Sequence, residues 1–139
     1  MGVIVMSKVQ QTAPMLRFKG YTDAWVQRKM GKIYKVYSGQ TPSRGESTNF
    51  ENPTTPWLKT MDLNNGEVIS NDESISDKGA KSLKIHPVGT VLIAMYGGFN
   101  QIGRTGLLTY PATINQALAA LEPNKQIDNY FLLTHCVPN

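Results

Sequence analysis

Cysteine and histidine are scarce in this chain of 139 residues, which holds one cysteine, Cys136, and two histidines, His86 and His135. A single cysteine excludes an internal disulfide, and two histidines far apart in the sequence leave no cluster with metal-ligand spacing. His135 and Cys136 are neighbours, so on a helix they point about 100° apart and cannot form a catalytic dyad. We therefore expect no metal and no cofactor, and His86, which precedes Pro87, is interpreted as structural.

Long hydrophobic runs are also missing, because no apolar stretch approaches the roughly 18 residues of a membrane span. The opening residues 1–6 are too short for a signal peptide, and Met6 stands where a myristoylation signal has Ser or Thr. These features predict a cytoplasmic protein that has no membrane partner.

Acidic residues are rare in the first third of the chain. Residues 1–44 contain eight Lys or Arg and one acid, a net charge of +7, whereas residues 45–139 contain six bases and nine acids, a net of −3. An uneven distribution of this kind suggests a basic face that meets a polyanion. A solvated basic segment with no partner is an equal alternative on this evidence.

The length corresponds to about one domain. Residues 1–14 lack periodicity and are expected to form a flexible tail, followed by one domain over residues 15–139. The patterns predict strands over 32–37, 57–61 and 90–95 and a further strand after the glycine-rich loop at 97–106. Turns or loops are expected at 38–43, 45–56 and 64–66, and short helices at 23–31, 76–81 and 127–136. We therefore predict an α+β fold, with a twisted mixed or antiparallel sheet and a few short helices.

The most informative stretch is the glycine-rich loop and the strand before it. The loop carries Tyr96, Asn100, Gln101 and Arg104 on a backbone that glycine allows to approach a partner closely. Arg side chains pair with guanine or phosphate, and Asn or Gln pair with adenine. The loop therefore favours DNA recognition, although a glycine-rich hairpin with incidental polar residues would look the same.

The same loop nearly matches the phosphate-binding sequence G-x-x-x-x-G-K-[ST], at residues 98–105. Arg104 replaces the lysine of that motif, and the residues that follow include Gly106 and Pro111 where the motif needs a helix. Nucleotide hydrolysis is therefore disfavoured.

No other grouping predicts catalysis. Asp72, Glu73 and Asp77 are interpreted as a solvated acidic face rather than an acid/base pair, and Trp25 and Trp57 as packing residues. An Asn-Pro-Pro-aromatic tetrapeptide and a G-x-G cofactor loop, which mark DNA methyltransferases, are absent. We predict that the chain is not an enzyme and has no catalytic residues.

Several short segments occur in the order typical of one protein family. The segments, which together span about residues 16–133, are Trp25-x-x-x-Lys29-Met30-Gly31-x-Ile33, residues 38–43, 56–63, Ile75-Ser76-x-x-Gly79, Pro87-x-Gly89-Thr90-Val91-Leu92, Gly103, Asn115-Gln116-Ala117-Leu118-x-x-Leu121-x-Pro123 and Ile127-Asp128-x-x-Phe131-Leu132. In this order they resemble a target recognition domain of the DNA specificity subunit of type I restriction–modification systems.

The resemblance implies a non-catalytic reader of double-stranded DNA. Such subunits carry two recognition domains separated by long antiparallel helices, and each domain reads one half of a bipartite site. Adenine methylation and ATP-driven cleavage belong to partner subunits. These partners are the methyltransferase (modification) subunit and the restriction subunit, which associates through it. The implied DNA contacts are Thr41, Ser43, Arg44, Lys59, Thr60, Tyr96, Asn100, Gln101 and Arg104. The residues implied to maintain the fold are Gly31, Trp57, Gly89 and Asn115.

The sequence also departs from the family pattern. It ends at Asn139, where the family continues toward a spacer helix and a second recognition domain, so a domain truncated before the spacer helix is expected. An alternative function is an interaction protein, which occupies the recognition-domain position on a methyltransferase subunit or pairs with a second truncated specificity subunit.

Overall fold

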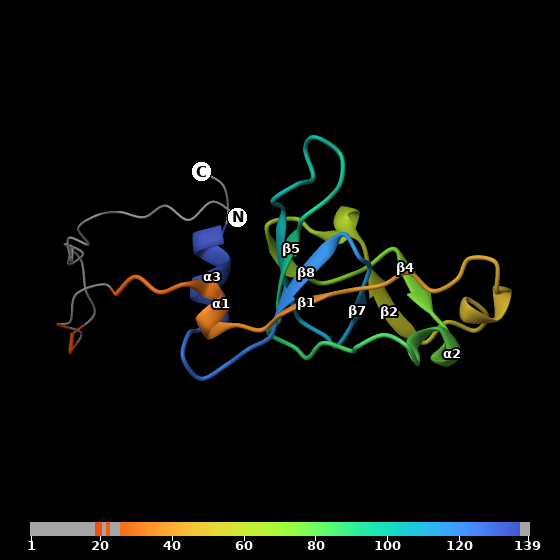
Figure 1. Ribbon diagram of the computed structural model, residues 1–139, viewed down its shortest axis with the longest axis horizontal. Helices are drawn as coiled ribbons and strands as arrows, with labels where there is room; N and C mark the ends of the chain where they lie inside the picture. The colour runs from red at the N-terminus through yellow and green to blue at the C-terminus, as the bar shows by residue number, and fades with distance from the viewer. Residues whose placement is uncertain (1–18, 21, 23–25, 137–139) are drawn as a thin grey trace. The chain divides into compact units, whose positions relative to one another are not determined.

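The computed structural model describes residues 19–20, 22 and 26–136 (Figure 1). The chain divides into two compact units, residues 1–33 and residues 34–139. The expected tail at 1–14 lies outside the described residues. In the first unit the described helix is α1 (Met30–Ile33).

The helix predicted over 23–31 is only partly present. Residues 23–25 are outside the described part, residues 26–29 are not helical, and Gly31 lies inside α1 instead of ending a helix. Cations at positions 28, 29 and 32 repel one another in so short a segment, and isolated helices of this length are marginal in water. The predicted strand at 32–37 is likewise reduced to β1 (Val36–Ser38).

The second unit contains a five-stranded mixed sheet in the order β1-β8-β5-β6-β3. The other strands are β8 (Leu118–Leu121), β5 (Val91–Ala94), β6 (Thr105–Leu108) and β3 (Gly66–Val68). Neighbours are antiparallel except β3 and β6, which are parallel. Strand β5 lies at the centre, where Val91 pairs with Leu107 on one side and Leu121 on the other.

A second, three-stranded sheet has the order β4-β2-β7. Its strands are β4 (Glu73–Ile75), β2 (Thr55–Leu58) and β7 (Thr113–Ile114). β2 is antiparallel to β4 and parallel to β7, and Trp57 pairs with both Glu73 and Thr113. The predicted α+β class, with mixed sheets and a few short helices, is confirmed.

One hydrophobic core joins the two sheets. Leu58 and Ile114 from the smaller sheet are buried in the same cluster as Leu92, Leu108 and Leu118 from the larger one. Each buried leucine removes enough apolar area from water to contribute roughly 1.5–3 kcal/mol. The shared core therefore fixes the loops of both sheets relative to each other.

The C-terminal helix α3 (Asn129–Cys136) packs against β5 and β6, and it confirms the helix predicted over 127–136. The Asp128 carboxylate accepts hydrogen bonds from the backbone N–H groups of Tyr130 (2.8 Å) and Phe131 (3.2 Å), as a helix cap does. Asn129 is buried and donates to the carbonyl oxygens of Gly89 (2.7 Å) and Leu121 (3.1 Å). These bonds attach the helix to the sheet.

The strand predicted over 57–61 is wrong at its end, because β2 runs from Thr55 to Leu58 and a 3₁₀ turn, η2 (Thr60–Asp62), follows. The Asp62 carboxylate accepts a hydrogen bond from the Lys59 backbone N–H at 2.7 Å, which closes this turn.

The predicted loop at 45–56 contains the 3₁₀ turn η1 (Ser47–Asn49) and the start of β2. The predicted helical turn at 76–81 is confirmed as α2 (Asp77–Ala80), with Ser76 as its cap.

Candidate nucleic-acid interface

The loop between β5 and β6, residues 95–104, projects away from the sheet (Figure 1). Its base is closed by two hydrogen bonds of 2.8 Å, from Ala94 N–H to the Arg104 carbonyl and from Gly103 N–H to the Ala94 carbonyl. Gly103 has φ +84°, a backbone conformation that residues with a side chain rarely adopt. Inside the loop the Gln101 side-chain oxygen accepts a hydrogen bond from Gly98 N–H at 3.1 Å. The loop thus has a defined shape built from its own polar groups.

Large apolar side chains are exposed on this loop. Phe99 is fully exposed, and Tyr96 and Ile102 are also exposed. Side chains of this kind on a projecting loop indicate a binding surface rather than part of the core. Phe99 and Ile102 were not among the residues predicted from the sequence, although apolar residues inside a polar, glycine-rich loop were a usable signal.

The residues after β2 support the base of the loop. Thr60 is only 7% exposed, and its hydroxyl donates to the Tyr96 carbonyl at 3.2 Å. On the other side, the Met95 N–H donates to the Ala117 carbonyl at 2.8 Å. Thr41 bonds the residue before Ala117, because its hydroxyl donates to the Gln116 side-chain oxygen at 2.6 Å.

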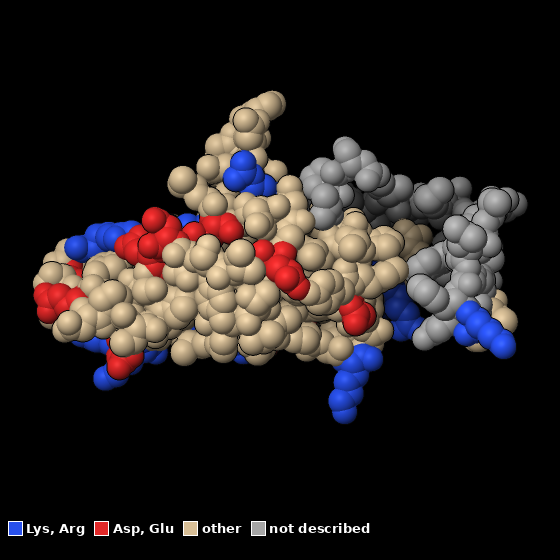
Figure 2. Space-filling model, turned by 180° about the vertical axis from the view of Figure 1, so that it is seen from behind, with Lys and Arg blue, Asp and Glu red and all other residues tan. Residues whose placement is uncertain are grey.

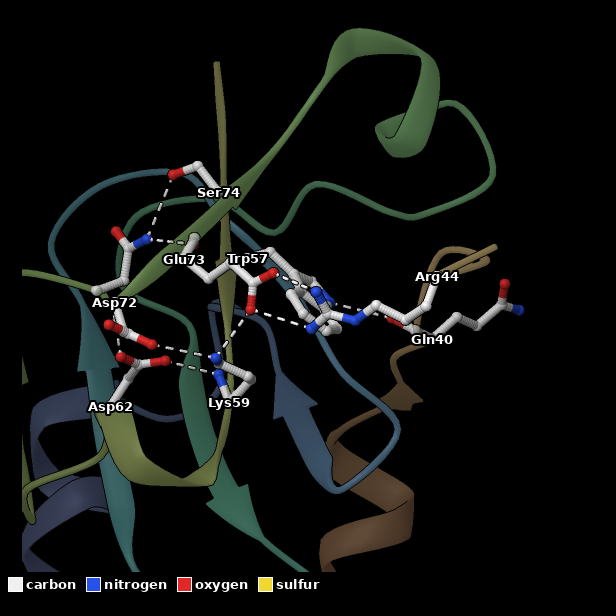
Figure 3. A network of polar contacts seen from close by, with 9 residues as sticks. Gln40, Arg44, Trp57, Lys59, Asp62, Asp72, Glu73 and Ser74 are labelled. Atoms are coloured by element: carbon white, nitrogen blue, oxygen red, sulfur yellow. Dashed lines mark hydrogen bonds and ion pairs between the residues drawn. The ribbon is translucent and has the colours of Figure 1, made fainter. Parts of the chain in front are cut away.

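A network of charged groups includes Lys59, the residue that precedes Thr60 in the chain (Figure 3). Both terminal nitrogens of Arg44 hydrogen-bond the Glu73 carboxylate, at 2.6 and 3.1 Å. The Lys59 ammonium hydrogen-bonds the same carboxylate at 2.9 Å and that of Asp72 at 3.2 Å. The Arg44 guanidinium also lies over the ring of Trp57, at 5.2 Å from its centroid. Two cations are therefore held together by one shared carboxylate.

The charges in this network shift one another's pKa. The hydrogen bond from Arg44 holds the pKa of Glu73 below its ordinary value, and Lys59 contributes in the same direction. In return, the hydrogen bond to Glu73 raises the pKa of Arg44 and Lys59.

The interpretation of the acidic residues as a solvated face is wrong for Glu73, whose side chain is 23% exposed and paired with two cations. The partners of Glu73 are distant in sequence, so its own neighbours could not reveal the pairing.

The surface around the loop is not uniformly basic. Figure 2 shows acidic side chains in a band across the face drawn there, below the projecting β5–β6 loop. Within the loop itself, residues 95–104 contain Arg104 and no acid. The loop therefore carries a net positive charge above this acidic band.

The sequence of this chain matches the family model of the type I restriction modification DNA specificity domain over residues 22–138. The chain belongs to this family. The resemblance predicted from the short segments is thereby confirmed.

Two curated specificity subunits and two solved structures are similar to this specificity domain. The chain is 28% identical over 116 residues to the specificity subunit of the type I restriction enzyme EcoR124I/EcoR124II of Escherichia coli, covering 81% of this chain and 28% of the relative. It is 26% identical over 113 residues to the EcoprrI specificity subunit of the same organism, covering 77% and 27%.

The first structure is the HsdS subunit of Thermoanaerobacter tengcongensis, with a TM-score of 0.59 and 26% identity over 76% of this chain and 25% of that one. The second comes from work on complex assembly and conformational transition of the type I R-M system, with a TM-score of 0.58 and 26% identity over 77% and 25%. The chain thus spans about a quarter of the length of these relatives.

Most of the DNA contacts predicted for this specificity domain lie around the β5–β6 loop. Tyr96, Asn100, Gln101 and Arg104 are on the loop, with Gln101 and Arg104 half-buried at its sides. Lys59 and Thr60 adjoin its base. Ser43 lies in the turn before Arg44, where its carbonyl accepts a hydrogen bond from the Asn49 side chain at 3.0 Å.

Of the four residues expected to maintain the fold of the specificity domain, three have contacts or a backbone conformation that explain the role, and one does not. Trp57 is buried and its indole N–H donates to the Gln40 carbonyl at 3.1 Å, and Gly89 has φ +86°. Asn115 accepts a hydrogen bond from Ala117 N–H at 3.1 Å. Gly31 differs, because a side chain there would meet nothing within 4 Å. Trp25 lies outside the described residues.

His86 is buried in the specificity domain, where its Nδ1 lies 2.9 Å from a carboxylate oxygen of Glu122. Burial lowers the pKa of His86. Among the residues that the structure describes, no group of three His, Cys, Asp or Glu side chains could hold a metal ion. No helix in the described part of the chain is long and apolar enough to cross a membrane.

Proposed function

We propose that this chain recognises a short DNA sequence, as the half-site reader of a type I restriction–modification specificity subunit, and that it catalyses no reaction itself. The family match over residues 22–138 supports the DNA-recognition role. The observation that carries the proposal is the projecting β5–β6 loop. It presents side chains that can hydrogen-bond base edges, and its backbone is fixed by its own hydrogen bonds.

Base recognition is assigned to the loop. Asn100 has the amide group that pairs with adenine, and Arg104 has the two-pronged donor that pairs with guanine. Gln101 has the same amide group and would read adenine by exchanging the hydrogen bond that its oxygen accepts from Gly98 N–H. Each such contact would discriminate against a wrong base by roughly 1–3 kcal/mol. Tyr96, Phe99 and Ile102 supply apolar surface for contact with bases or sugars.

Contacts to the DNA backbone are assigned to the residues around the loop. Thr41, Ser43, Arg44 and Lys59 carry hydroxyl or cationic groups of the kind that bind phosphate without reading sequence. Thr60 has a different role in this proposal, because its hydroxyl already bonds the Tyr96 carbonyl. We assign it to holding the loop in position.

The proposed partners follow from the relatives, which are specificity subunits of type I restriction enzymes. They are a methyltransferase (modification) subunit and, through it, a restriction subunit, and a second half specificity subunit would complete a bipartite site. The site of action would be the cytoplasm.

Selection of duplexes from a randomised library by the full chain tests this function. We expect one short sequence to be enriched, with binding that weakens steeply as salt rises, because phosphate contacts release counterions. Arg104→Ala should lose the preference at one base position, whereas Glu67→Ala, at an exposed residue of the edge strand β3 outside the loop, should keep it. Co-purification with a methyltransferase subunit but no enrichment from the library would instead support the interaction-protein alternative.

A further inference from the structure

Two of the cations assigned to the DNA backbone, Arg44 and Lys59, are neutralised by carboxylates of the same chain. Arg44 makes two hydrogen bonds to Glu73, and Lys59 hydrogen-bonds both Glu73 and Asp72. An arginine uses this same forked geometry to bind a phosphate. The Glu73 carboxylate therefore occupies the position in which an anionic ligand of Arg44 would lie (Figure 3).

Glu73 is not the only group that positions these cations. The Arg44 guanidinium lies over two aromatic rings, 4.6 Å from the centroid of Phe50 and 5.2 Å from that of Trp57. Trp57 is itself fixed by burial. The Lys59 ammonium lies 5.8 Å from the same Trp57 centroid. Both cations would thus stay near their present positions if the charge of Glu73 were removed.

The exposure of the groups suits exchange of one anion for another. The Arg44 side chain is 57% exposed, so a ligand can reach it, whereas the Glu73 side chain is 23% exposed. Lys59 directly precedes Thr60, which bonds the start of the β5–β6 loop. The backbone of a duplex whose base edges meet the loop would therefore pass close to these cations.

We propose that Arg44 and Lys59 form a binding site for a DNA phosphate, and that Glu73 occupies this site in the free protein and is displaced when DNA binds. Glu73 then sets how tightly the chain binds any duplex without changing which sequence it prefers. This inference rests on the proposed function and adds to it a carboxylate that opposes binding.

The first test is Glu73→Gln, which keeps the shape of the side chain and removes its charge. Each additional phosphate that the protein neutralises steepens the dependence of log affinity on log salt by about 0.9, or about eightfold in affinity between 1 M and 0.1 M salt. For the one phosphate of this site we expect about eightfold tighter binding at 0.1 M salt, equal for the selected duplex and a scrambled one. Glu67→Gln makes the same change in net charge on an exposed residue of β3 and should have little effect.

A second pair of variants separates a local effect from a general charge effect. In the Arg44→Gln background, Glu73→Gln should increase affinity much less, because one of the two freed cations is gone. Asp72→Asn provides a gentler change, since Asp72 is 80% exposed and its carboxylate pairs with Lys59 alone among the cations of the described residues. It should tighten binding by less than Glu73→Gln does, and Lys59→Gln should abolish that increase. Thermal unfolding of each variant checks that the fold is retained.

Retention on heparin, a polyanion without bases, distinguishes the two proposals. If no sequence is selected but Glu73→Gln binds heparin and duplexes more tightly through Arg44, sequence reading is wrong and the phosphate site is supported. If a sequence is selected but Glu73→Gln and Asp72→Asn behave like Glu67→Gln, the phosphate site is wrong and sequence reading is supported. Failure of every variant to bind either polyanion overturns both.

Discussion

Gly39→Ala tests how the segment that carries Thr41, Ser43 and Arg44 is held in place. A methyl group on Gly39 would lie well inside contact distance of the backbone carbonyl oxygens of Ile114 and Asn115. Backbone cannot rotate away as a flexible side chain can, so the segment must move.

Two hydrogen bonds of 3.1 Å depend on the present position of this segment, one from Gln40 N–H to the Ile114 carbonyl and one from the Trp57 indole to the Gln40 carbonyl. Each contributes about 0.5–1.5 kcal/mol, and the steric overlap adds a cost of similar size. We expect Gly39→Ala to lower the free energy of unfolding by about 2–4 kcal/mol. Urea denaturation monitored by tryptophan fluorescence measures it.

Gly45→Ala is the matched control, because the nearest atom to a methyl group there is the Ser43 hydroxyl oxygen at 3.8 Å. It should be neutral or stabilise by up to about 1 kcal/mol, since alanine restricts the unfolded chain. Equal free energies of unfolding for the two variants would refute the reasoning that Gly39 is required by close backbone approach.

Three further predictions concern stability and binding. Asn129→Ala should cost about 2–4 kcal/mol by urea denaturation, because it removes a buried side chain bonded to Tyr34, Gly89 and Leu121; a loss below about 1 kcal/mol would contradict this. Since burial lowers the pKa of His86 from 6.5, the unfolded state binds the proton more readily, so stability should be complete above pH 6.5 and fall by up to about 1.4 kcal/mol per pH unit below it. A urea midpoint that falls equally between pH 6.5 and 5.5 in His86→Gln would show that another group is responsible. Phe99→Ala should leave the melting temperature unchanged, because the side chain is fully exposed, and weaken duplex binding in fluorescence anisotropy; unchanged binding would exclude the loop tip from the interface.

Local signals in the sequence predicted part of the fold. Asp128 indicated the start of α3 because its carboxylate caps the first turn, and the Asn64-Asn65-Gly66 turn is present with Asn65 at φ +62°. The parallel pairings of β2 with β7 and of β3 with β6 were not predictable in this way. They join segments far apart in the chain, and only the shared core decides which strands become neighbours.

The sequence also carried a local signal for the loop of the candidate site. The glycines and polar residues of 97–106 indicated a projecting loop, which the structure contains. The pairing of Arg44 with Glu73 links residues 29 positions apart, one in the loop after β1 and one in β4, so no local pattern predicts it. The capping of Lys59 by Asp62 likewise ended a strand that alternation alone would have continued.

Selection from a randomised duplex library, with the wild-type chain beside Arg104→Ala, tests the central claim most directly. We expect one enriched sequence for the wild type and loss of preference at a single base position in the variant, as a base-reading loop requires. Recovery of the same unbiased pool by both proteins would contradict it.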